Sequence, residues 1–474
     1  MYTVDRRKFV AGSAAVTAGT VLFGKPARAD KLAPPYPIPD GPLTKDDYKK
    51  LTRMTSEVMA KNRVRHGDYV FHMPAFGKYN SLFGWDSGWH AIAMTRIDPS
   101  IAASEIEYLT TFQIEETGRI PHDTMFREMN KDRNWYSKLG LAMGDSQYDE
   151  QGRTAMIDPP SYIIAAENIY EQTGDRAWLD RVLPRLERCV NYLTNDRDLF
   201  GDGLVSVIHP WETGTDSSPA YDEILNIDFS TPFGAPKRGL LYPRLLDYNA
   251  KFDWDPQVAK EKNRFVLEDA CFNSITMRAI LSVANLNEKI GNNGKAEKHR
   301  KLARKMMAAM DRVNWVEEEG CWFSRYDTKD PKLAMRTTCA SLLPTLSGLA
   351  SKEKAKRVIE EHALNREEFW LDYLFPFSAA DEMKDEKIYM EDLVLWRGHC
   401  IWTNMNWMMM HALLNYGYRE EARELTRKTA KMIEHEGLWE FYDWRNGQGK
   451  GQKEFNWPGL VLDMMAVSWP ETVS

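Results

Sequence analysis

Four segments of the chain combine carboxylates with tryptophans and turn-forming residues. They are YNSLFGWDSGWH (79–90), HPWETGTDSSPAYD (209–222), LWRGHCIWTNMNW (395–407) and GLWEFYDWRNGQGKGQKEFNWPG (437–459). Prolines, glycines and short polar residues make the second segment a constrained loop rather than a helix. Because carboxylates are costly to bury among indoles unless they are paired or used, we interpret the four segments as parts of one active site.

Paired carboxylates beside aromatic platforms are what glycoside hydrolysis requires. One carboxyl group protonates the leaving oxygen, and the other activates a water or attacks the anomeric carbon. The four segments offer Asp86, Glu212, Asp216, Glu440 and Glu454 for these roles. The sequence has no G-x-S-x-G elbow, phosphate-binding glycine loop or H-E-x-x-H pair, and its ten histidines show no metal-ligand spacing. We therefore expect that neither a metal nor a cofactor is required.

The four segments resemble glycoside hydrolase family 63, particularly its mannosylglycerate and glucosylglycerate hydrolases, with trehalases as more distant relatives in the same clan. The resemblance runs through motifs from roughly Tyr79 to Trp457. It implies that Asp216, within HPWETGTDSSP, is the general acid, and that Glu440, within LWEFYD, is the general base. It also implies that eight further residues bind substrate: Tyr79, Trp85, Asp86, Trp211, Glu212, Trp396, Arg397 and Glu454.

The chain departs from the family pattern at two positions. It has D-S-S-P where the family has D-N-S-P, and W-R-G-H, ending at His399, where the family has W-R-G-P. Glu454 is the strongest competitor of Glu440 for the role of base. We predict an inverting α-glycosidase of the α-glucosidase type that acts on a small α-glucoside or α-mannoside, or on an oligosaccharide end. Two other classes stay open: a polysaccharide lyase on a helical toroid, and a noncatalytic sugar-binding protein.

Three pairs of expected helices share one design and would position these loops. In the pairs 160–173/175–194, 268–290/295–313 and 399–416/418–435, the first helix is apolar nearly all round and the second has one apolar stripe. Glycines at each junction allow the chain to reverse. Further helices are expected at 44–61, 87–96, 99–113, 336–349, 351–363 and 457–467. Nested inner and outer helices predict an all-α (α/α)6 barrel with long loops at one rim, and a short strand is expected at 203–208.

The first 29 residues are typical of a targeting segment. Arg6 and Arg7, a weakly apolar run and an A-x-A pattern ending at Ala29 resemble a twin-arginine signal peptide, with a Sec signal as the alternative. We therefore expect one catalytic domain over 30–474, exported to the periplasm or secreted.

Composition narrows the expected partners of the exported chain. The net charge of −7 gives no basic footprint, so we expect a carbohydrate partner and no nucleic acid. No other apolar run approaches membrane-spanning length, so no membrane contact is expected after signal cleavage, and the oligomeric state cannot be read from the sequence. The five cysteines are scattered without a disulfide or metal pattern, and we expect them in the core.

Overall fold

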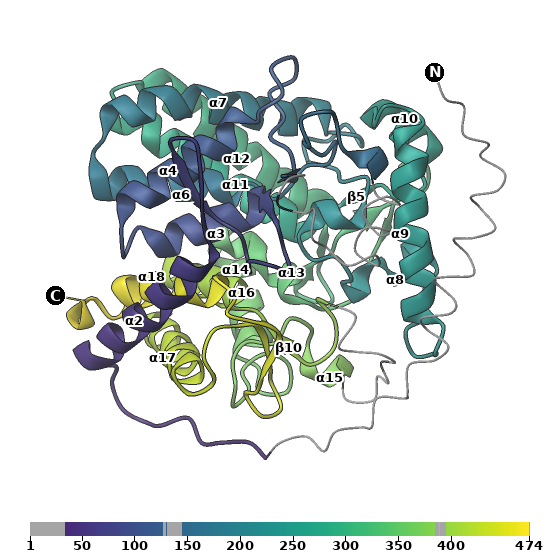
Figure 1. Ribbon diagram of the computed structural model, residues 1–474. Coiled ribbons are helices and arrows are strands. Elements are labelled where there is room, and N and C mark those ends of the chain that lie inside the picture. The colour runs from purple at the N-terminus through teal and green to yellow at the C-terminus, as the bar shows by residue number, and fades with distance from the viewer. Residues whose placement is uncertain (1–33, 127–128, 130–144, 384–387, 389–394, 474) are drawn as a thin grey trace.

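The computed structural model describes residues 34–473 except 127–128, 130–144, 384–387 and 389–394 (Figure 1). The expected signal peptide, residues 1–29, lies outside the described residues. Within them, mostly buried helices form an inner ring and half-exposed helices surround it. The inner segments are, in order, α3 (Gly84–Met94), α6 (Ser161–Thr173), α11 (Ala270–Lys289), α13 (Cys339–Leu342) with the 3-10 turn η5 (Leu343–Ser347), α16 (Thr403–Asn415), and the 3-10 turn η8 (Trp457–Leu460) with α18 (Val461–Ser468).

Each inner segment packs on the next one, and the last returns to α3, so the ring is closed. All eleven residues of α3 are buried, as its apolar composition requires. The outer helices are α4 (Pro99–Thr111), α7 (Arg176–Asp196), α12 (Asn293–Val313), α14 (Lys352–Arg357) with a π-helical turn (Val358–Ala363), α17 (Arg419–Glu436) and α2 (Lys45–Asn62).

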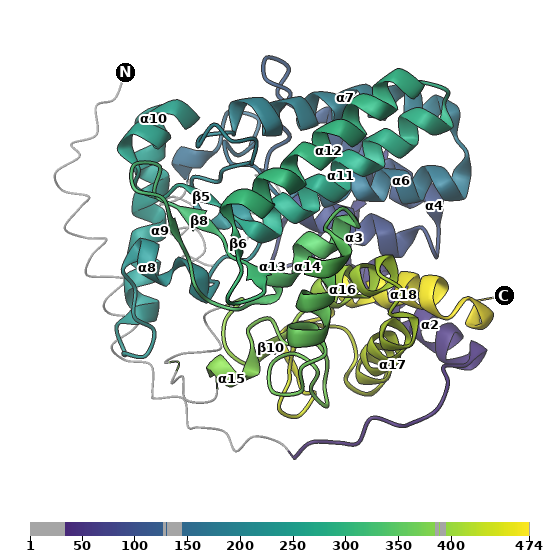
Figure 2. The ribbon, with the colours of Figure 1, turned by 180° about the vertical axis from the view of Figure 1, so that it is seen from behind.

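The two ends of the ring meet where α2 packs on α18, and these helices lie side by side in both views (Figures 1 and 2). From behind, α11 and α12 run next to each other as one helical hairpin (Figure 2). Gly174, which ends α6, has a φ of 61°, the left-handed conformation expected of a glycine that closes a helix. The fold is therefore the (α/α)6 barrel that the sequence predicts.

Short antiparallel strands shape the loops between the helices. They are β1 (Arg63–His66) with β2 (Tyr69–His72); β3 (Ser81–Phe83) with β4 (Asp123–Met125); β5 (Leu267–Glu268), β8 (Arg325–Tyr326) and β9 (Lys332–Leu333); β6 (Trp315–Val316) with β7 (Cys321–Trp322); and β10 (Cys400–Ile401), β11 (Trp439–Asp443) and β12 (Gly449–Lys453). The strand expected at 203–208 is wrong, because only Val207 pairs there, in a single bridge to Leu267.

Several helices were not predicted. The largest is α9 (Gly234–Ala250), which contains Pro243 and stands with α10 (Pro256–Lys262) along one edge of the molecule in both views (Figures 1 and 2). Two short helices were also missed, α8 (Asp222–Leu225) and α15 (Ala380–Met383). The helix expected at 336–349 is instead α13 followed by the 3-10 turn η5, since Pro344 lacks the N–H that a continued helix needs.

Two expectations about the chain's chemistry can be compared with the described residues. All five cysteines are free and buried, which confirms their place in the core. Among the described helices, none combines the length and the apolar character that a membrane crossing would need.

Candidate active site

The acidic and aromatic loops enclose a cavity of about 330 Å³. This volume lies at the small end of the range for ligand pockets. Seven of the ten residues that the sequence singles out line the cavity: Tyr79, Trp85, Asp86, Trp211, Asp216, Trp396 and Glu440. The four loops, which are far apart in the sequence, therefore meet around one cavity.

Asp216 reaches the cavity from a loop that is held on both sides. The loop begins with a 3-10 turn over Pro210–Thr213, and Tyr242 of α9 donates a hydrogen bond of 2.6 Å to the backbone carbonyl of Asp216. Burial raises the pKa of the Asp216 carboxyl group; Arg238 and His122 oppose the rise, and Glu440 adds to it. A carboxyl group that keeps its proton to higher pH is suited to act as a general acid.

Glu440 is a buried carboxylate on β11 with donors on both oxygens. Its Oε1 accepts a hydrogen bond of 2.7 Å from the Tyr79 hydroxyl, and its Oε2 accepts one of 2.8 Å from the backbone N–H of Gln452. The Lys78 Nζ lies 3.7 Å from Oε2. These contacts fix the position of the carboxylate in the cavity.

The strand pairing explains how Glu440 is aimed. The register between β11 and β12 shifts at this residue, since Trp439 lies opposite Lys453 while Phe441 lies opposite Lys450. Such irregularities redirect a side chain out of the regular ladder. Gly451, in the extra stretch, has a φ of 71°, and a Cβ there would lie 2.6 Å from Oε2 of Glu440. The place of the carboxylate therefore depends on a glycine at position 451.

A second acidic group in the cavity contains residues that the sequence analysis missed. Asp158 accepts a hydrogen bond of 2.6 Å from the backbone N–H of Trp85, and its Oδ1 lies 3.0 Å from His122 Nδ1. Burial alone would lower the pKa of His122, but the Asp158 carboxylate outweighs it and raises the pKa to about 10. Burial, and then the charge of Asp158, raises the pKa of Asp86 well above its usual value. The only sequence signal for Asp158 is its position before the paired prolines that lead into α6.

Aromatic rings form much of the remaining wall. Trp396 and Trp402 stack with their ring centroids 3.8 Å apart, and Phe441 stacks on the far side of Trp402 with centroids 5.0 Å apart. Trp85 and Trp457 meet edge to face at 6.0 Å. Trp85, Trp396, Trp402 and Trp457 all line the cavity, which gives it the flat apolar surfaces that a sugar ring can pack against.

Three of the ten predicted site residues do not line the cavity. Glu212 is fully buried in an ion pair of 2.6 Å with Arg197 and also accepts the backbone N–H groups of Ile157 and Ile208, so its oxygens are occupied by the protein. Its position is that of a residue that fixes the Asp216 loop, which corrects the expectation that it holds the sugar.

Arg397 and Glu454, the other two residues, are paired with side chains outside the cavity. Arg397 is buried, pairs with Asp222 and packs over the Phe229 ring. Glu454 is exposed and lies 2.5 Å from Lys61 Nζ. Neither is placed to touch a ligand in the cavity, and Glu454 is not placed to compete with Glu440 for the role of base.

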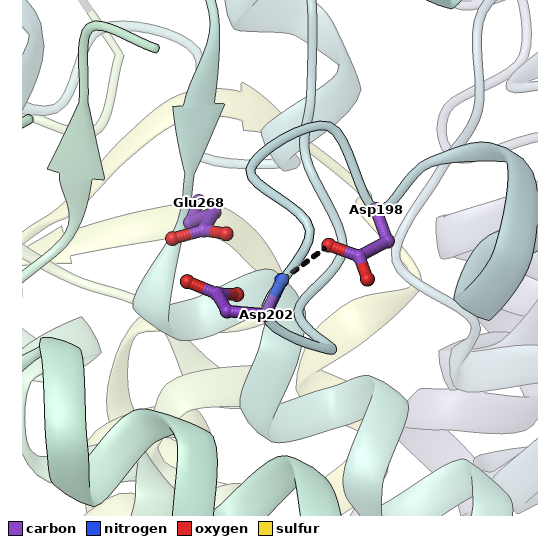
Figure 3. A group of neighbouring side chains, drawn as sticks. All are labelled: Asp198, Asp202 and Glu268. Carbon is purple, nitrogen blue, oxygen red and sulfur yellow. Dashed lines mark hydrogen bonds between the residues drawn. The ribbon is translucent and has the colours of Figure 1, made fainter. Parts of the chain in front are cut away.

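Among the described residues, one group of three carboxylates is close enough to share a cation: Asp198, Asp202 and Glu268 (Figure 3). None of the three lines the cavity. The carboxylates that do line it are arranged with hydrogen-bond donors and aromatic rings, an arrangement typical of a sugar site.

A barrel of helical hairpins whose aromatic cavity contains two carboxyl groups is typical of glycoside hydrolases with an (α/α)6 barrel. Residues 79–458 match the family model described as the mannosylglycerate hydrolase MGH1-like glycoside hydrolase domain. The chain belongs to this family. It is 27% identical over 436 residues to mannosylglycerate hydrolase MGH2 of Selaginella moellendorffii, a match that covers 87% of this chain and 84% of that protein.

Solved structures show the same fold. The glycoside hydrolase family 63 mannosylglycerate hydrolase from Thermus thermophilus, crystallised with Tris and D-glycerate, matches with a TM-score of 0.74 at 24% identity over 89% of this chain and all of that chain. Neutral trehalase Nth1 from Saccharomyces cerevisiae matches with a TM-score of 0.56 at 17% identity over 88% of this chain and 79% of that one. The family model therefore identifies the protein as a glycoside hydrolase of the MGH1-like family, and the lyase and noncatalytic alternatives are set aside.

Proposed function

We propose that the protein hydrolyses a small α-hexoside with inversion of the anomeric configuration. The observation that carries the proposal is that Asp216 and Glu440 line one cavity in chemically different surroundings. Burial raises the pKa of Asp216, whereas Glu440 accepts hydrogen bonds on both oxygens. Two carboxyl groups whose surroundings differ in this way divide into an acid and a base.

In the proposed reaction, Asp216 donates its proton to the glycosidic oxygen as the bond to the anomeric carbon breaks. Glu440 takes a proton from a water that attacks the opposite face of the sugar. The products are a free hexose of inverted configuration and the alcohol. For this reaction the two carboxyl groups must lie about 6.5–9.5 Å apart, against about 5–5.5 Å in a retaining enzyme.

We propose that the sugar is mannose or glucose and that the alcohol is a small hydroxy acid of the glycerate type. Support comes from the relative in Selaginella, named a mannosylglycerate hydrolase, and from the small volume of the cavity. Lys78 and His122 bring positive charge to the cavity wall, where a carboxylate of the alcohol would be stabilised.

A substrate panel tests this proposal. The purified mature protein is incubated with α-mannosylglycerate, α-glucosylglycerate, the two methyl α-hexosides and trehalose, with the Asp216→Asn variant as control. We expect the highest kcat/KM with a glycerate glycoside and none of this activity in the variant. A higher kcat/KM with trehalose or a methyl hexoside would refute the proposed alcohol, and no hydrolysis of any member would refute the proposed reaction.

We also propose that the protein is exported by the twin-arginine route, on the evidence of Arg6, Arg7 and the weakly apolar run that follows them. Replacing both arginines by lysine should leave uncleaved precursor in the cytoplasm on fractionation. Unchanged export of that variant would show that the arginine pair is incidental.

A further inference from the structure

Two loops of the cavity wall meet near the end of α2. The early loop, residues 74–80, carries Tyr79, whose hydroxyl donates a hydrogen bond to the proposed base, Glu440. The late loop, residues 454–457, carries Trp457, which also lines the cavity. The place of the Tyr79 hydroxyl over the carboxylate therefore depends on what fixes the early loop.

One side-chain amide bonds to both loops at once. Asn62 is the last residue of α2, and only 3% of its surface is exposed. Its Oδ1 accepts a hydrogen bond of 2.9 Å from the backbone N–H of Phe76 in the early loop. Its Nδ2 donates bonds of 2.8 Å to the backbone carbonyl of Glu454 and to Oδ1 of Asn456, both in the late loop.

The partners leave the Asn62 amide only one favourable orientation. An N–H faces its Oδ1 and two oxygens face its Nδ2, so a flipped amide would place oxygen against oxygen. Asn456 is fully buried, and its Nδ2 donates 2.8 Å to the carbonyl of Met73 while its backbone N–H donates 3.2 Å to that of Pro74. The two asparagines therefore form one set of hydrogen bonds that joins α2, the early loop and the late loop.

The tip of the early loop gains little from apolar packing, because the Phe76 residue there is 57% exposed. The N–H groups of Lys78 and Tyr79 both donate to the carbonyl of Ala75, which gives the loop its shape but does not fix it to the barrel. A segment with few buried apolar contacts opens at low cost unless hydrogen bonds hold it. The bond from Phe76 to Asn62 therefore fixes the place of the tip.

We propose that Asn62 is a positioning residue for hydrolysis, which holds the early loop so that the Tyr79 hydroxyl stays on the Glu440 carboxylate. The helix that carries it is a firm support, since α2 packs on α17, α18 and η8. Asn62 does not itself line the cavity, so it acts through Tyr79 and not on the substrate. This inference rests on the proposed function, in which Glu440 is the base.

A double-mutant cycle with Tyr79→Phe tests the inference on the mature chain, residues 30–474. Asn62→Ala alone should lower kcat/KM for the best panel substrate by about tenfold, because the hydroxyl no longer stays on the carboxylate. In the Tyr79→Phe background, the same change should lower kcat/KM by less than about twofold, since the hydroxyl is already absent. Equal losses in the two backgrounds would overturn the inference, because Asn62 would then act independently of Tyr79.

Amide hydrogen exchange tests the anchor without any need for activity. The Phe76 N–H should exchange about tenfold faster in Asn62→Ala than in the wild type, because it loses its acceptor and the loop opens more often. Unchanged exchange would overturn the inference. If the wild type hydrolysed no panel substrate, the proposed function would fail, whereas the exchange rate would still decide for or against the anchor.

Asn287→Ala is the matched control. Asn287 is a fully buried asparagine of α11 whose Nδ2 donates to Glu187 at 2.9 Å and to the carbonyl of Val283 at 3.0 Å. Its loss should lower the melting temperature but leave both kcat/KM and the exchange of Phe76 unchanged, at a temperature where every variant is folded. A loss of kcat/KM as large as that of Asn62→Ala would overturn the inference, because lowered stability alone would explain both.

A second variant keeps the test decisive if Asn62→Ala does not fold. Asn456→Ala removes the other half of the hydrogen-bond set, including the bond to Met73. It should give the same pattern: a loss of kcat/KM that largely disappears in the Tyr79→Phe background, and faster exchange at Phe76. A folded Asn456→Ala protein with wild-type kcat/KM and wild-type exchange would overturn the inference.

Discussion

Replacing Tyr79 by phenylalanine isolates the contact that holds the proposed base. The variant removes the hydroxyl that donates to Oε1 of Glu440 at 2.7 Å and keeps the ring, which meets Phe455 edge to face with centroids 6.0 Å apart. The carboxylate keeps its second hydrogen bond, from the backbone N–H of Gln452. The change therefore removes one charge-assisted bond while the shape of the cavity stays the same.

The expected magnitude follows from the charge on the acceptor. A hydrogen bond to a charged group is worth about 1.5–3 kcal/mol. Because about 1.4 kcal/mol corresponds to a factor of ten in rate, kcat/KM should fall by about ten- to a hundredfold if the bond persists in the transition state.

Steady-state kinetics with the best substrate of the panel measure this loss. Tyr416→Phe serves as the control, because the Tyr416 hydroxyl donates to the backbone carbonyl of Ala350 at 3.1 Å, away from the cavity, and its loss should leave kcat/KM unchanged. A Tyr79→Phe enzyme with unchanged kcat/KM would refute the reasoning. A rise in KM alone would make Tyr79 a residue that encloses the substrate and not one that supports the base.

Three other substitutions test separate parts of the site. Asp216→Asn should abolish hydrolysis of substrates with a poor leaving group and spare most activity on a glycosyl fluoride, because the departure of fluoride needs no proton. Since burial raises the pKa of Asp216, the folded wild type loses stability as pH rises through that pKa. The melting temperature of the variant relative to wild type should therefore increase with pH. Asp86→Ala should raise KM more than it lowers kcat, and a pure loss of kcat would place Asp86 in the chemical step. Arg197→Met leaves Glu212 as an unpaired buried charge and should lower the free energy of unfolding by about 3–5 kcal/mol in urea, whereas Arg176→Met, at an exposed pair, should change it by less than about 1 kcal/mol.

The sequence predicts the barrel well because the patterns that mark its helices are local in the sequence. Inner helices are apolar all round and outer ones have a single stripe, so periodicity and junction glycines suffice to place them. The prediction fails where the local signal is ambiguous. Pro243 lies inside α9, and a proline within a helix argues against predicting that helix. Pro344 lies where a continuous helix was expected and a 3-10 segment forms instead. The apolar run at 203–208 looks like a strand, although only Val207 finds a partner there.

The candidate site is less predictable because its roles depend on partners far away in the sequence. Glu212 beside a tryptophan looks like a sugar ligand, and only the fold shows that Arg197 occupies it. Glu454 beside F-x-W looks like a rival base until Lys61, 393 positions away, is found next to it. Asp158 and His122 sit in segments without an unusual composition, and they become part of the site only because β4 and the start of α6 meet at the cavity.

The stereochemistry of the product tests the central claim most directly. Proton NMR during the first turnovers of an α-glucoside or α-mannoside shows the anomer that is released before mutarotation. The account predicts that the free sugar appears first as the β-anomer, because Glu440 directs water to the face opposite Asp216. First release of the α-anomer would contradict the account, since it would require Glu440 or another carboxylate to attack the anomeric carbon itself.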